Sequence, residues 1–372
     1  MIIKNALLYE ENVGFVKKDL YIEKDRISYN SDSNSEIIDA EGLYAIPGLI
    51  DIHFHGCVGY DFCDGTKEAI QAIADYESSC GVTSICPATM TLGYEELSKI
   101  FSNAASYQSD HGADLVGIYM EGPYLSHEKK GAQNDAYIKV PDIEHFKEMQ
   151  KLSGGLIKVV AIAPEAAGAM EFIKEVKDDV VISVAHTTAN YEIATKAFEC
   201  GASNVTHLYN AMLPFSHRKP GVVGAASDAE HVKVELICDG LHIDPSVVRA
   251  TFKIFGDDRI ILISDSMMAT GLADGEYSLG KQKVFVTGNK ATLTDGTIAG
   301  STTNLMACMK SAVNMGIPLE SAVKCATVNP AKQIGIFDEY GSLAPGKYAD
   351  VVLLNKNLDI DTIILKGKVQ RA

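Results

Sequence analysis

The chain has 372 residues, and its 33 Lys and Arg against 49 Asp and Glu give a formal net charge of −16. Because a negatively charged surface repels phosphate backbones and anionic bilayers, the composition argues against a nucleic-acid partner and against a membrane-surface protein. No apolar run approaches the roughly 20 residues that span a bilayer, no signal peptide is recognisable, and the eight cysteines contain no CxxC pair, so we expect a cytoplasmic protein with reduced thiols.

The sequence patterns at both ends of the chain predict short antiparallel strands. They are Met1–Tyr9, Gly14–Ile22 and Arg26–Tyr29 at one end, and Val351–Leu354 and Thr362–Val369 at the other. Neither group alone supplies enough strands for an independent core. We therefore expect one small β-sandwich domain assembled from residues 1–46 and 341–372.

Between the two ends, apolar β-branched runs alternate with amphipathic helical stretches. The runs that predict strands are Ala45–Ile52, Val82–Cys86, Leu115–Met120, Ile157–Ala163, Val180–Ala185, Asn204–Thr206, Val232–Cys238 and Arg259–Ser264. The helical stretches are Thr66–Cys80, Tyr94–Tyr107, Ile143–Leu152, Ala167–Asp178 and Tyr191–Cys200. Eight strands separated by helices favour a (β/α)8 TIM-type barrel over residues 47–340. The connection after the sixth strand has little helical pattern, and residues 277–294 predict a β-hairpin inserted after the eighth.

Five of the predicted strands are followed closely by a potential metal ligand. These ligands are His53 and His55, Glu121, His186, His207 and Asp265. A buried strand that ends in such a residue is the pattern of an active site at the carboxyl-terminal face of a barrel. His53 and His55 lie on the same side of an extended chain, about 6.6–6.8 Å apart along it, so both can reach one ion.

Glu121, His186 and His207 supply the three protein ligands and one open position that are typical of catalytic zinc. Taken singly, Glu121 is compatible with a solvated loop acid, and each histidine with a core residue bound to a backbone carbonyl. Their occurrence together at strand ends favours a metal site that activates water. Ligands of this type discriminate poorly between ions, so Zn²⁺, Fe²⁺, Co²⁺ and Mn²⁺ all fit.

Asp265 is the candidate for proton transfer as well as a candidate ligand. A carboxylate beside a metal can accept a proton from water and pass it to a leaving nitrogen. The alternative is a structural role as the N-cap of a helix at Ser266–Met268. We expect the catalytic role, because the other candidate ligands accompany it.

The motifs around these residues resemble those of the N-acetylglucosamine-6-phosphate deacetylases of the amidohydrolase superfamily. They are His53-x-His55, Glu121-Gly-Pro123, His186-Thr-Thr, Thr206-His-Leu-Tyr-Asn-Ala-Met212, Asp239-Gly-Leu-His242 and Ser264-Asp265, followed by Ile298-Ala-Gly-Ser301, Ala326-Thr-Val-Asn-Pro-Ala331 and the stretch from Gly341 to Asp350. The resemblance covers nearly the whole chain. It implies hydrolysis of the acetamide of N-acetylglucosamine 6-phosphate to glucosamine 6-phosphate and acetate, in amino-sugar catabolism or cell-wall recycling, with Asp265 as the acid/base.

The resemblance also implies how many metal ions the chain holds. Matching motif positions assign the main metal to Glu121, His186 and His207. Some members carry a Gln-x-Asn type sequence at the first motif and bind one metal, whereas His53-x-His55 is similar to the members that hold a second ion, with Glu121 as the bridge. The resemblance thus implies one or two divalent ions per subunit.

For the substrate, the resemblance implies that His242 contacts the sugar or the scissile carbonyl and that Asn210 and Ala211 belong to the phosphate-binding loop. His217 and Arg218 lie in a compact basic loop of an acidic chain. A solvated loop is the alternative reading, but the planar fork of Arg suits a phosphate dianion. In some members this loop reaches the 6-phosphate from the neighbouring subunit, which implies a homodimer that shares the Arg218 loop.

Other functions on the same scaffold are the alternatives, because one barrel hosts many reactions. They include an N-acetylgalactosamine-6-phosphate deacetylase, a dihydroorotase-like enzyme and an N-acyl amino acid hydrolase. The loops around Asn210 and Arg218 favour a phosphosugar, but the sequence does not indicate which C4 epimer of the sugar is the substrate. A non-catalytic metal-binding barrel is a further alternative, against which the complete ligand set and Asp265 argue.

Overall fold

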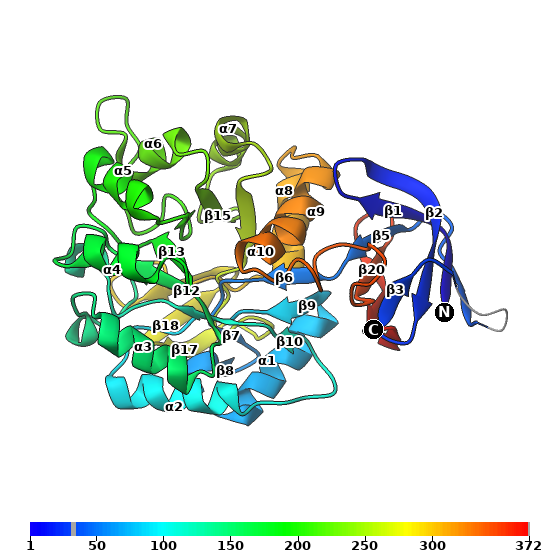
Figure 1. Cartoon of the computed structure of the whole chain (residues 1–372), viewed down its shortest axis with the longest axis horizontal. Helices are drawn as coiled ribbons and strands as arrows, with labels where there is room; N and C mark the ends of the chain where they lie inside the picture. Colours follow the sequence, from blue (N-terminus) through cyan, green and yellow to red (C-terminus); the bar gives the residue numbers. More distant parts are fainter. Residues whose placement is uncertain (31–34, 371–372) are drawn as a thin grey trace.

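The computed structural model describes residues 1–30 and 35–370. Its strands form two regions, a terminal sheet made from both ends of the chain and a larger α/β body that lies beside it (Figure 1). The expected domain ranges 1–46 and 341–372 include residues 31–34 and 371–372, which lie outside the described residues.

The terminal sheet joins the first and last strands of the chain. Its order is β22-β21-β20-β5-β1-β2-β3, with β4 paired to β1. The strands are β1 (Ile2–Glu10), β2 (Gly14–Glu23), β3 (Arg26–Ser28), β4 (Ile37–Asp39), β5 (Tyr44–Pro47), β20 (Val351–Leu354), β21 (Ile360–Leu365) and β22 (Lys368–Gln370). Side chains such as Ile3, Leu8, Leu20 and Ile22 fill a separate apolar core. The pairing is continuous, unlike the two separate sheets of the expected sandwich, because β5 pairs with β1 on one side and with β20 on the other.

The body is built on parallel strands that are largely buried on both faces. They pair in the orders β10-β9-β6 and β11-β12-β13-β14-β15-β16. The strands are β6 (Leu49–Asp51), β9 (Val82–Ile85), β10 (Asp114–Leu115), β11 (Ile118–Met120), β12 (Ile157–Ile162), β13 (Val181–Val184), β14 (Asn204–Val205), β15 (Lys233–Ile237) and β16 (Ile260–Ile263). Ala88, after β9, forms an isolated β-bridge with Tyr119 of β11 and so connects the two groups. The Asp265 N–H, after β16, donates to the His53 carbonyl, after β6, at 3.0 Å and connects them a second time. The strands therefore form a curved parallel arrangement whose carboxyl ends face one side.

Helices cover the outside of these strands (Figure 1). They are α1 (Lys67–Ser79), α2 (Tyr94–Ala105), α3 (Ile143–Leu152), α4 (Ala169–Val176), α5 (Tyr191–Cys200), α6 (Gly221–Asp228), α7 (Pro245–Phe255), α8 (Leu305–Asn314), α9 (Leu319–Ala326) and α10 (Val328–Gln333), with 3-10 turns at Phe62–Asp64, His127–Lys129 and Asp135–Tyr137. Residues at helical spacing, such as Ile70, Ile73 and Ala74 of α1, are buried. Among residues 1–30 and 35–370, no helix is both long and apolar enough to cross a membrane.

Two of the expected strands are each divided at a glycine. The run Ala45–Ile52 separates into β5 of the terminal sheet and β6 of the body, and Leu115–Met120 separates between β10 and β11. A Cβ at Gly48 would lie 2.1 Å from a Thr83 side-chain oxygen, and one at Gly117 would lie 2.4 Å from a side-chain carbon of β12. Only glycine permits these close approaches, so the chain changes partners at these positions.

Two further segments differ from the expectation. Residues 277–294 do not form a simple hairpin but belong to an antiparallel ribbon of β17 (Gly275–Leu279), β18 (Gln282–Thr287) and β19 (Lys290–Leu293). The connection after β14 contains α6, whose Gly- and Ala-rich sequence gives little amphipathic pattern. A short ribbon of β7 (Gly56–Cys57) and β8 (Tyr60–Asp61) follows β6.

Candidate active site

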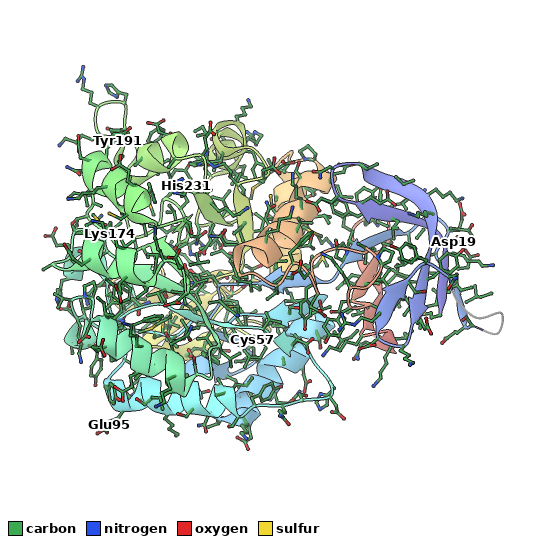
Figure 2. The ribbon with its side chains drawn as sticks, viewed as in Figure 1. Asp19, Cys57, Glu95, Lys174, Tyr191 and His231 are labelled. Carbon is green, nitrogen blue, oxygen red and sulfur yellow. The ribbon has the colours of Figure 1, made fainter. Side chains whose placement is uncertain are left out.

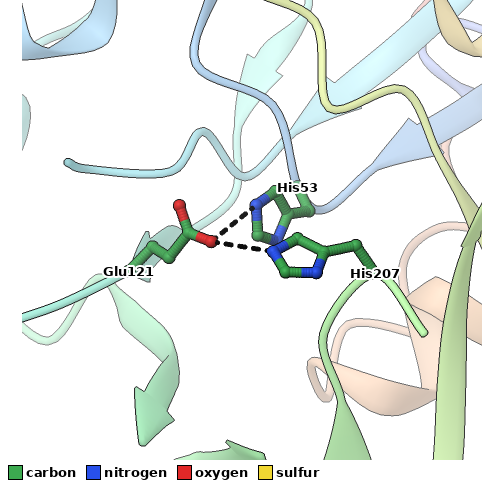
Figure 3. A group of neighbouring side chains, drawn as sticks. All are labelled: His53, Glu121 and His207. Atoms are coloured by element: carbon green, nitrogen blue, oxygen red, sulfur yellow. Dashed lines mark hydrogen bonds and ion pairs between the residues drawn. The ribbon is translucent and has the colours of Figure 1, made fainter. Parts of the chain in front are cut away.

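Side chains from several strand ends meet at the carboxyl-terminal side of the parallel strands. Figure 3 shows His53, Glu121 and His207, which follow β6, β11 and β14, pointing toward one another. His207 Nε2 lies 3.2 Å from Glu121 Oε1, and His53 Nε2 lies 3.6 Å from the same oxygen. All three residues are buried. Glu121 is therefore the centre of the cluster.

His186, which follows β13, completes a first ligand group of Glu121, His186 and His207. Its Nε2 lies 3.0 Å from Glu121 Oε1 and 3.2 Å from His207 Nε2. Ligand atoms held about 2.0–2.1 Å from one tetrahedral ion are about 3.3 Å from each other, so this spacing fits such an ion. The structure brings together the residues that the sequence predicts for the main metal.

The hydrogen bonding of His186 also fits a cation. Its Nδ1 lies 2.8 Å from the carbonyl oxygen of Lys129, which can only accept, so the ring carries a proton on Nδ1. In the neutral ring, the Nε2 lone pair then points at Glu121 and His207. Lone pairs that converge in this way repel one another, and a divalent ion at their meeting point engages all of them at once.

His53, His55 and Asp265 form a second ligand group that meets the first at Glu121. His55 Nε2 lies 3.3 Å from Asp265 Oδ1 and 3.4 Å from Glu121 Oε2, and His53 Nε2 lies 3.7 Å from Asp265 Oδ1. Among the residues that the structure describes, His53 Nε2 has no hydrogen-bond partner, although this side chain is fully buried. A buried polar atom without a partner is costly, and a second ion would satisfy His53 Nε2.

Burial alone raises the pKa of a carboxyl group, but the pKa values of both site carboxylates are lowered. For Glu121, the charge of His53 and the close ring nitrogens of His186 and His207 outweigh burial and hold the pKa well below its usual value. For Asp265, the bond with His55 and nearby imidazole charges have the same effect on the pKa. In turn, neighbouring carboxylates overcome the effect of burial and raise the pKa of His53 to about 10. Both carboxylates are therefore held ionised, which is the form that binds a cation.

Three of the candidate ligands have a backbone conformation that is rare outside glycine. The φ angles are 42° at His186, 28° at His207 and 50° at Asp265. Such residues cost on the order of 1–3 kcal/mol each and cluster at functional sites. Backbone hydrogen bonds hold Asp265, since its N–H donates to His53 and its carbonyl accepts from the Ser301 N–H at 2.7 Å. The surrounding fold therefore fixes these side chains in place.

Gln133 is a supporting residue that the sequence analysis missed. Its Nε2 donates to Glu121 Oε2 at 2.7 Å, and its Oε1 accepts from the Thr91 N–H at 2.7 Å. It is buried in the loop that follows Glu121. Because this loop has neither a strand nor a helix pattern, no signal in the sequence singles Gln133 out.

Glu235 was missed as well, although the sequence contains a signal for it. It lies in β15 between Val234 and Leu236, inside a run that is otherwise mostly apolar. A carboxylate inside a buried strand requires partners, and Asn204 Nδ2 donates to it at 2.6 Å. An acid at such a position is therefore a reason to look for a neighbouring polar site.

A pocket of about 560 Å³ opens over the two ligand groups. His242, Asn210 and Ala211, which the sequence predicts for substrate binding, all line it. His242 Nδ1 lies 2.7 Å from Asp239 Oδ2; despite burial, this bond raises the pKa of His242. The antiparallel ribbon also lines the pocket, where the Gln282 side chain donates to the Ala132 carbonyl.

His217 and Arg218 lie away from this pocket. Residues 214–219 are exposed, in a loop that stands clear of the body beside α6 (Figures 1 and 2). Among the residues that the structure describes, neither His217 nor Arg218 lines the pocket of its own chain. The two ligand groups and the other predicted substrate residues are thus brought together, whereas this basic pair is not.

The geometry matches a known family. The model of the amidohydrolase family matches residues 44–370, a range that contains both ligand groups and all the body strands. The chain belongs to the amidohydrolase family. A curated relative named N-acetylglucosamine-6-phosphate deacetylase, from Bacillus subtilis (strain 168), is 38% identical over 334 residues, covering 87% of this chain and 84% of the relative. The family resemblance that the motifs predict is confirmed.

Two further comparisons bear on the substrate. A solved structure of N-acetyl-D-glucosamine-6-phosphate deacetylase from Mycobacterium smegmatis, a mutant in complex with N-acetyl-D-glucosamine-6-phosphate, has a TM-score of 0.92 and 31% identity, and the match covers 99% of this chain and 98% of that chain. A relative named N-acetylgalactosamine-6-phosphate deacetylase, from Escherichia coli O157:H7, is 32% identical over 335 residues, covering 89% of this chain and 88% of the relative.

Proposed function

We propose that this chain hydrolyses the acetamide of N-acetyl-D-glucosamine 6-phosphate to D-glucosamine 6-phosphate and acetate, in amino-sugar catabolism or cell-wall recycling. The main support for this function is that the first ligand group and Asp265 line the same pocket. The family and the deacetylase relative at 38% identity supply the reaction class. The chain is accordingly a hydrolase that acts on a linear amide bond.

We infer one divalent ion at the first ligand group and a second at the second ligand group, with Glu121 between them. A bound divalent ion supplies a Lewis acid that polarises an amide carbonyl and lowers the pKa of water. Imidazole and carboxylate donors suit Zn²⁺ or Fe²⁺, and Co²⁺ or Mn²⁺ would fit the same set. Gln133 holds Glu121 in place by its bond to Oε2, and the Lys129 carbonyl does the same for His186.

Asp265 is the proton-transfer group in this reaction. Because its pKa is lowered, it is ionised at neutral pH and can accept a proton from the attacking water as the new C–O bond forms. The same proton then passes to the amide nitrogen as the C–N bond breaks, which releases acetate and the free amine. Asp265 lines the pocket, where it can reach both the water and the leaving nitrogen.

His242 and the loop after β14 orient the sugar phosphate. His242 Nδ1 donates to Asp239, and this bond raises the pKa of the imidazole; in the protonated ring, Nε2–H can also donate to the sugar or the scissile carbonyl. Asn210 and Ala211 line the pocket and supply the phosphate-binding loop. Arg218 lies outside the pocket of its own chain, so we infer a homodimer in which the Arg218 loop, with His217, reaches the 6-phosphate in the neighbouring subunit.

The same proposal includes the architecture and the compartment. We infer that the curved parallel strands close as a (β/α)8 barrel over residues 47–340, supported by the Ala88–Tyr119 bridge and the Asp265–His53 hydrogen bond at the two edges. Residues 1–46 and 341–372 form the smaller β-domain.

A cytoplasmic location is supported by the eight cysteines, all of which are free, with Cys57 in the interior (Figure 2).

Acetate release from three substrates tests the function and its main alternative together. The metal-loaded protein is offered N-acetylglucosamine 6-phosphate, N-acetylgalactosamine 6-phosphate and unphosphorylated N-acetylglucosamine. The proposed function requires the largest kcat/KM for the first of them. Because one relative carries the name of the galactosamine enzyme, a larger value for the second would replace the proposed substrate by its C4 epimer.

A further inference from the structure

Glu235 is a buried carboxylate that belongs to neither ligand group and has no role in the proton transfer described above. It lies in β15, inside the parallel strands, with 0% of its surface exposed. A carboxylate removed from water is costly unless hydrogen bonds or opposite charges satisfy it. Its partners therefore show what it does.

Glu235 contacts both ligand groups through one oxygen. Its Oε2 lies 3.3 Å from His53 Nδ1 and accepts a hydrogen bond from the His207 N–H, also at 3.3 Å. Its Oε1 accepts from Asn204 Nδ2 at 2.6 Å, and Asn204 Nδ2 also lies 3.0 Å from Ser183 Oγ. The carboxylate is thus fixed from one side and faces the candidate ligands on the other.

The two ring nitrogens of His53 lie in different surroundings. Nδ1 faces Glu235, whereas Nε2 lies 3.6 Å from Glu121 Oε1 and 3.7 Å from Asp265 Oδ1. An ionised carboxylate can only accept a hydrogen bond, so Glu235 favours the tautomer with the proton on Nδ1. An ion that displaces the proton of Nε2 can then bind that nitrogen in the space between Glu121 and Asp265, while the proton on Nδ1 stays with Glu235. A carboxylate behind a ligating histidine fixes the ring and makes it a better ligand.

We propose that Glu235 is a positioning residue that holds the His53 proton on Nδ1 and so prepares Nε2 as a ligand of the second ion. The inference rests on the two-ion part of the proposed function and is independent of which sugar is bound.

Glutamine cannot reproduce these contacts. Glutamate offers two accepting oxygens, one to Asn204 and one to the pair formed by His53 Nδ1 and the His207 N–H. A glutamine has a single accepting oxygen. If this oxygen faces Asn204, the amide NH₂ faces His53 and moves the ring proton to Nε2, where it blocks the metal.

Titration of the apo protein with Zn²⁺, together with the metal content after dialysis, tests the inference. The parent should bind two ions, and Glu235→Gln should keep the first affinity and bind the second ion about 10- to 100-fold more weakly. Glu77→Gln is the matched control, because Glu77 is also 0% exposed but lies in α1 and lines no part of the pocket. In a His53→Gln background, Glu235→Gln should have no further effect on the second ion.

Parental affinity for both ions in Glu235→Gln would overturn the inference. Loss of the first ion as well would also overturn it, because the effect would then run through His207 or the fold and not through His53.

A parent that binds a single ion overturns the inference too, and acetate release by that parent would leave the deacetylase function intact. Conversely, a two-ion parent that releases no acetate contradicts the function while the metal titration still decides the role of Glu235.

A second measurement covers the case in which Glu235→Gln does not fold. Long-range ¹H–¹⁵N spectra of the zinc-loaded parent, assigned with His53→Gln, report which nitrogen of His53 carries the proton. We expect a protonated Nδ1 and a metal-bound Nε2. The opposite tautomer would overturn the inference.

Discussion

The buried carboxylates of the active site and of the terminal sheet differ in the direction of their pKa shifts. Asp265 and Glu121 have lowered pKa values, whereas burial raises the pKa of Asp350, next to β20 in the terminal sheet, to about 7. All three are removed from solvent. Imidazoles surround the first two, while Asp350 accepts one backbone bond, from the Lys366 N–H at 2.7 Å, and its other oxygen has no partner within residues 1–30 and 35–370. The neighbouring charges and hydrogen-bond donors of a buried acid, and not its burial, therefore decide whether it stays ionised and can bind a cation.

The largest effect is expected when an imidazole is removed from the first ligand group. His186→Ala or His207→Ala should lose both bound metal and turnover, because one of three protein ligands is missing. Elemental analysis and acetate release measure the two losses. His231→Ala, at an exposed histidine outside the pocket (Figure 2), is the matched control and should change neither. Full metal content and normal turnover in both ligand variants would contradict the assignment.

Asp265→Asn should keep the fold and the ion of the first ligand group and lower kcat by about 10²–10⁴. The amide has nearly the same shape as the carboxylate but cannot take up the proton of the attacking water. Stopped assays of acetate release, with metal content measured in parallel, check this result. Turnover within a few-fold of the parent would move proton transfer to another group, with His242 as the next candidate.

Arg218→Ala should reduce the preference for phosphorylated over unphosphorylated substrate by about 10–150-fold, the equivalent of a charge-assisted bond of ~1.5–3 kcal/mol. The loss should appear mainly in KM for the phosphosugar. If the loop acts across a dimer, a mixture of Arg218→Ala and Asp265→Asn chains should regain activity, since a hybrid holds one complete site. An unchanged preference would remove Arg218 from the phosphate site.

The smallest effect is expected in the terminal sheet. The pKa of Asp350 is raised from 3.8 to about 7 by burial. Between these values the folded state binds the proton more tightly than the unfolded chain, so stability falls as the pH rises from about 4 to about 7. Asp350→Asn should therefore stabilise the protein at pH 8 and have little effect near pH 4. Thermal unfolding at both pH values measures this; an equal effect at both would show that the charge of Asp350 is not responsible.

Much of the site could be predicted because the parallel arrangement imposes it. When strands run parallel, their carboxyl ends meet at one side, so a ligand after β6, β11, β13, β14 and β16 implies a common site. The positions of Glu121, His186 and His207 needed only this rule and the apolar runs before them. Glu235 in the middle of β15 needed a different rule, that a carboxylate inside an apolar strand requires buried partners.

What the sequence could not predict depends on contacts between distant segments. Gly48 lies where the apolar run passes from β5 to β6, and Thr83 lies too close to it for a Cβ. Gln133 supports Glu121 from a loop that is hydrogen-bonded to the antiparallel ribbon, since Gln282 donates to the Ala132 carbonyl. The terminal strands form one continuous sheet because β5 happens to pair on both sides, which local alternation does not encode. Pairing partners and loop paths are tertiary properties, and periodicity reports only on single elements.

Reconstitution of the apo protein with increasing Zn²⁺ or Fe²⁺ tests the metal-dependent deacetylase function, with acetate and glucosamine 6-phosphate measured from N-acetylglucosamine 6-phosphate. Turnover should rise with bound metal, and acetate and amine should appear in equal amounts. A folded protein with full metal content that releases neither product would contradict this function.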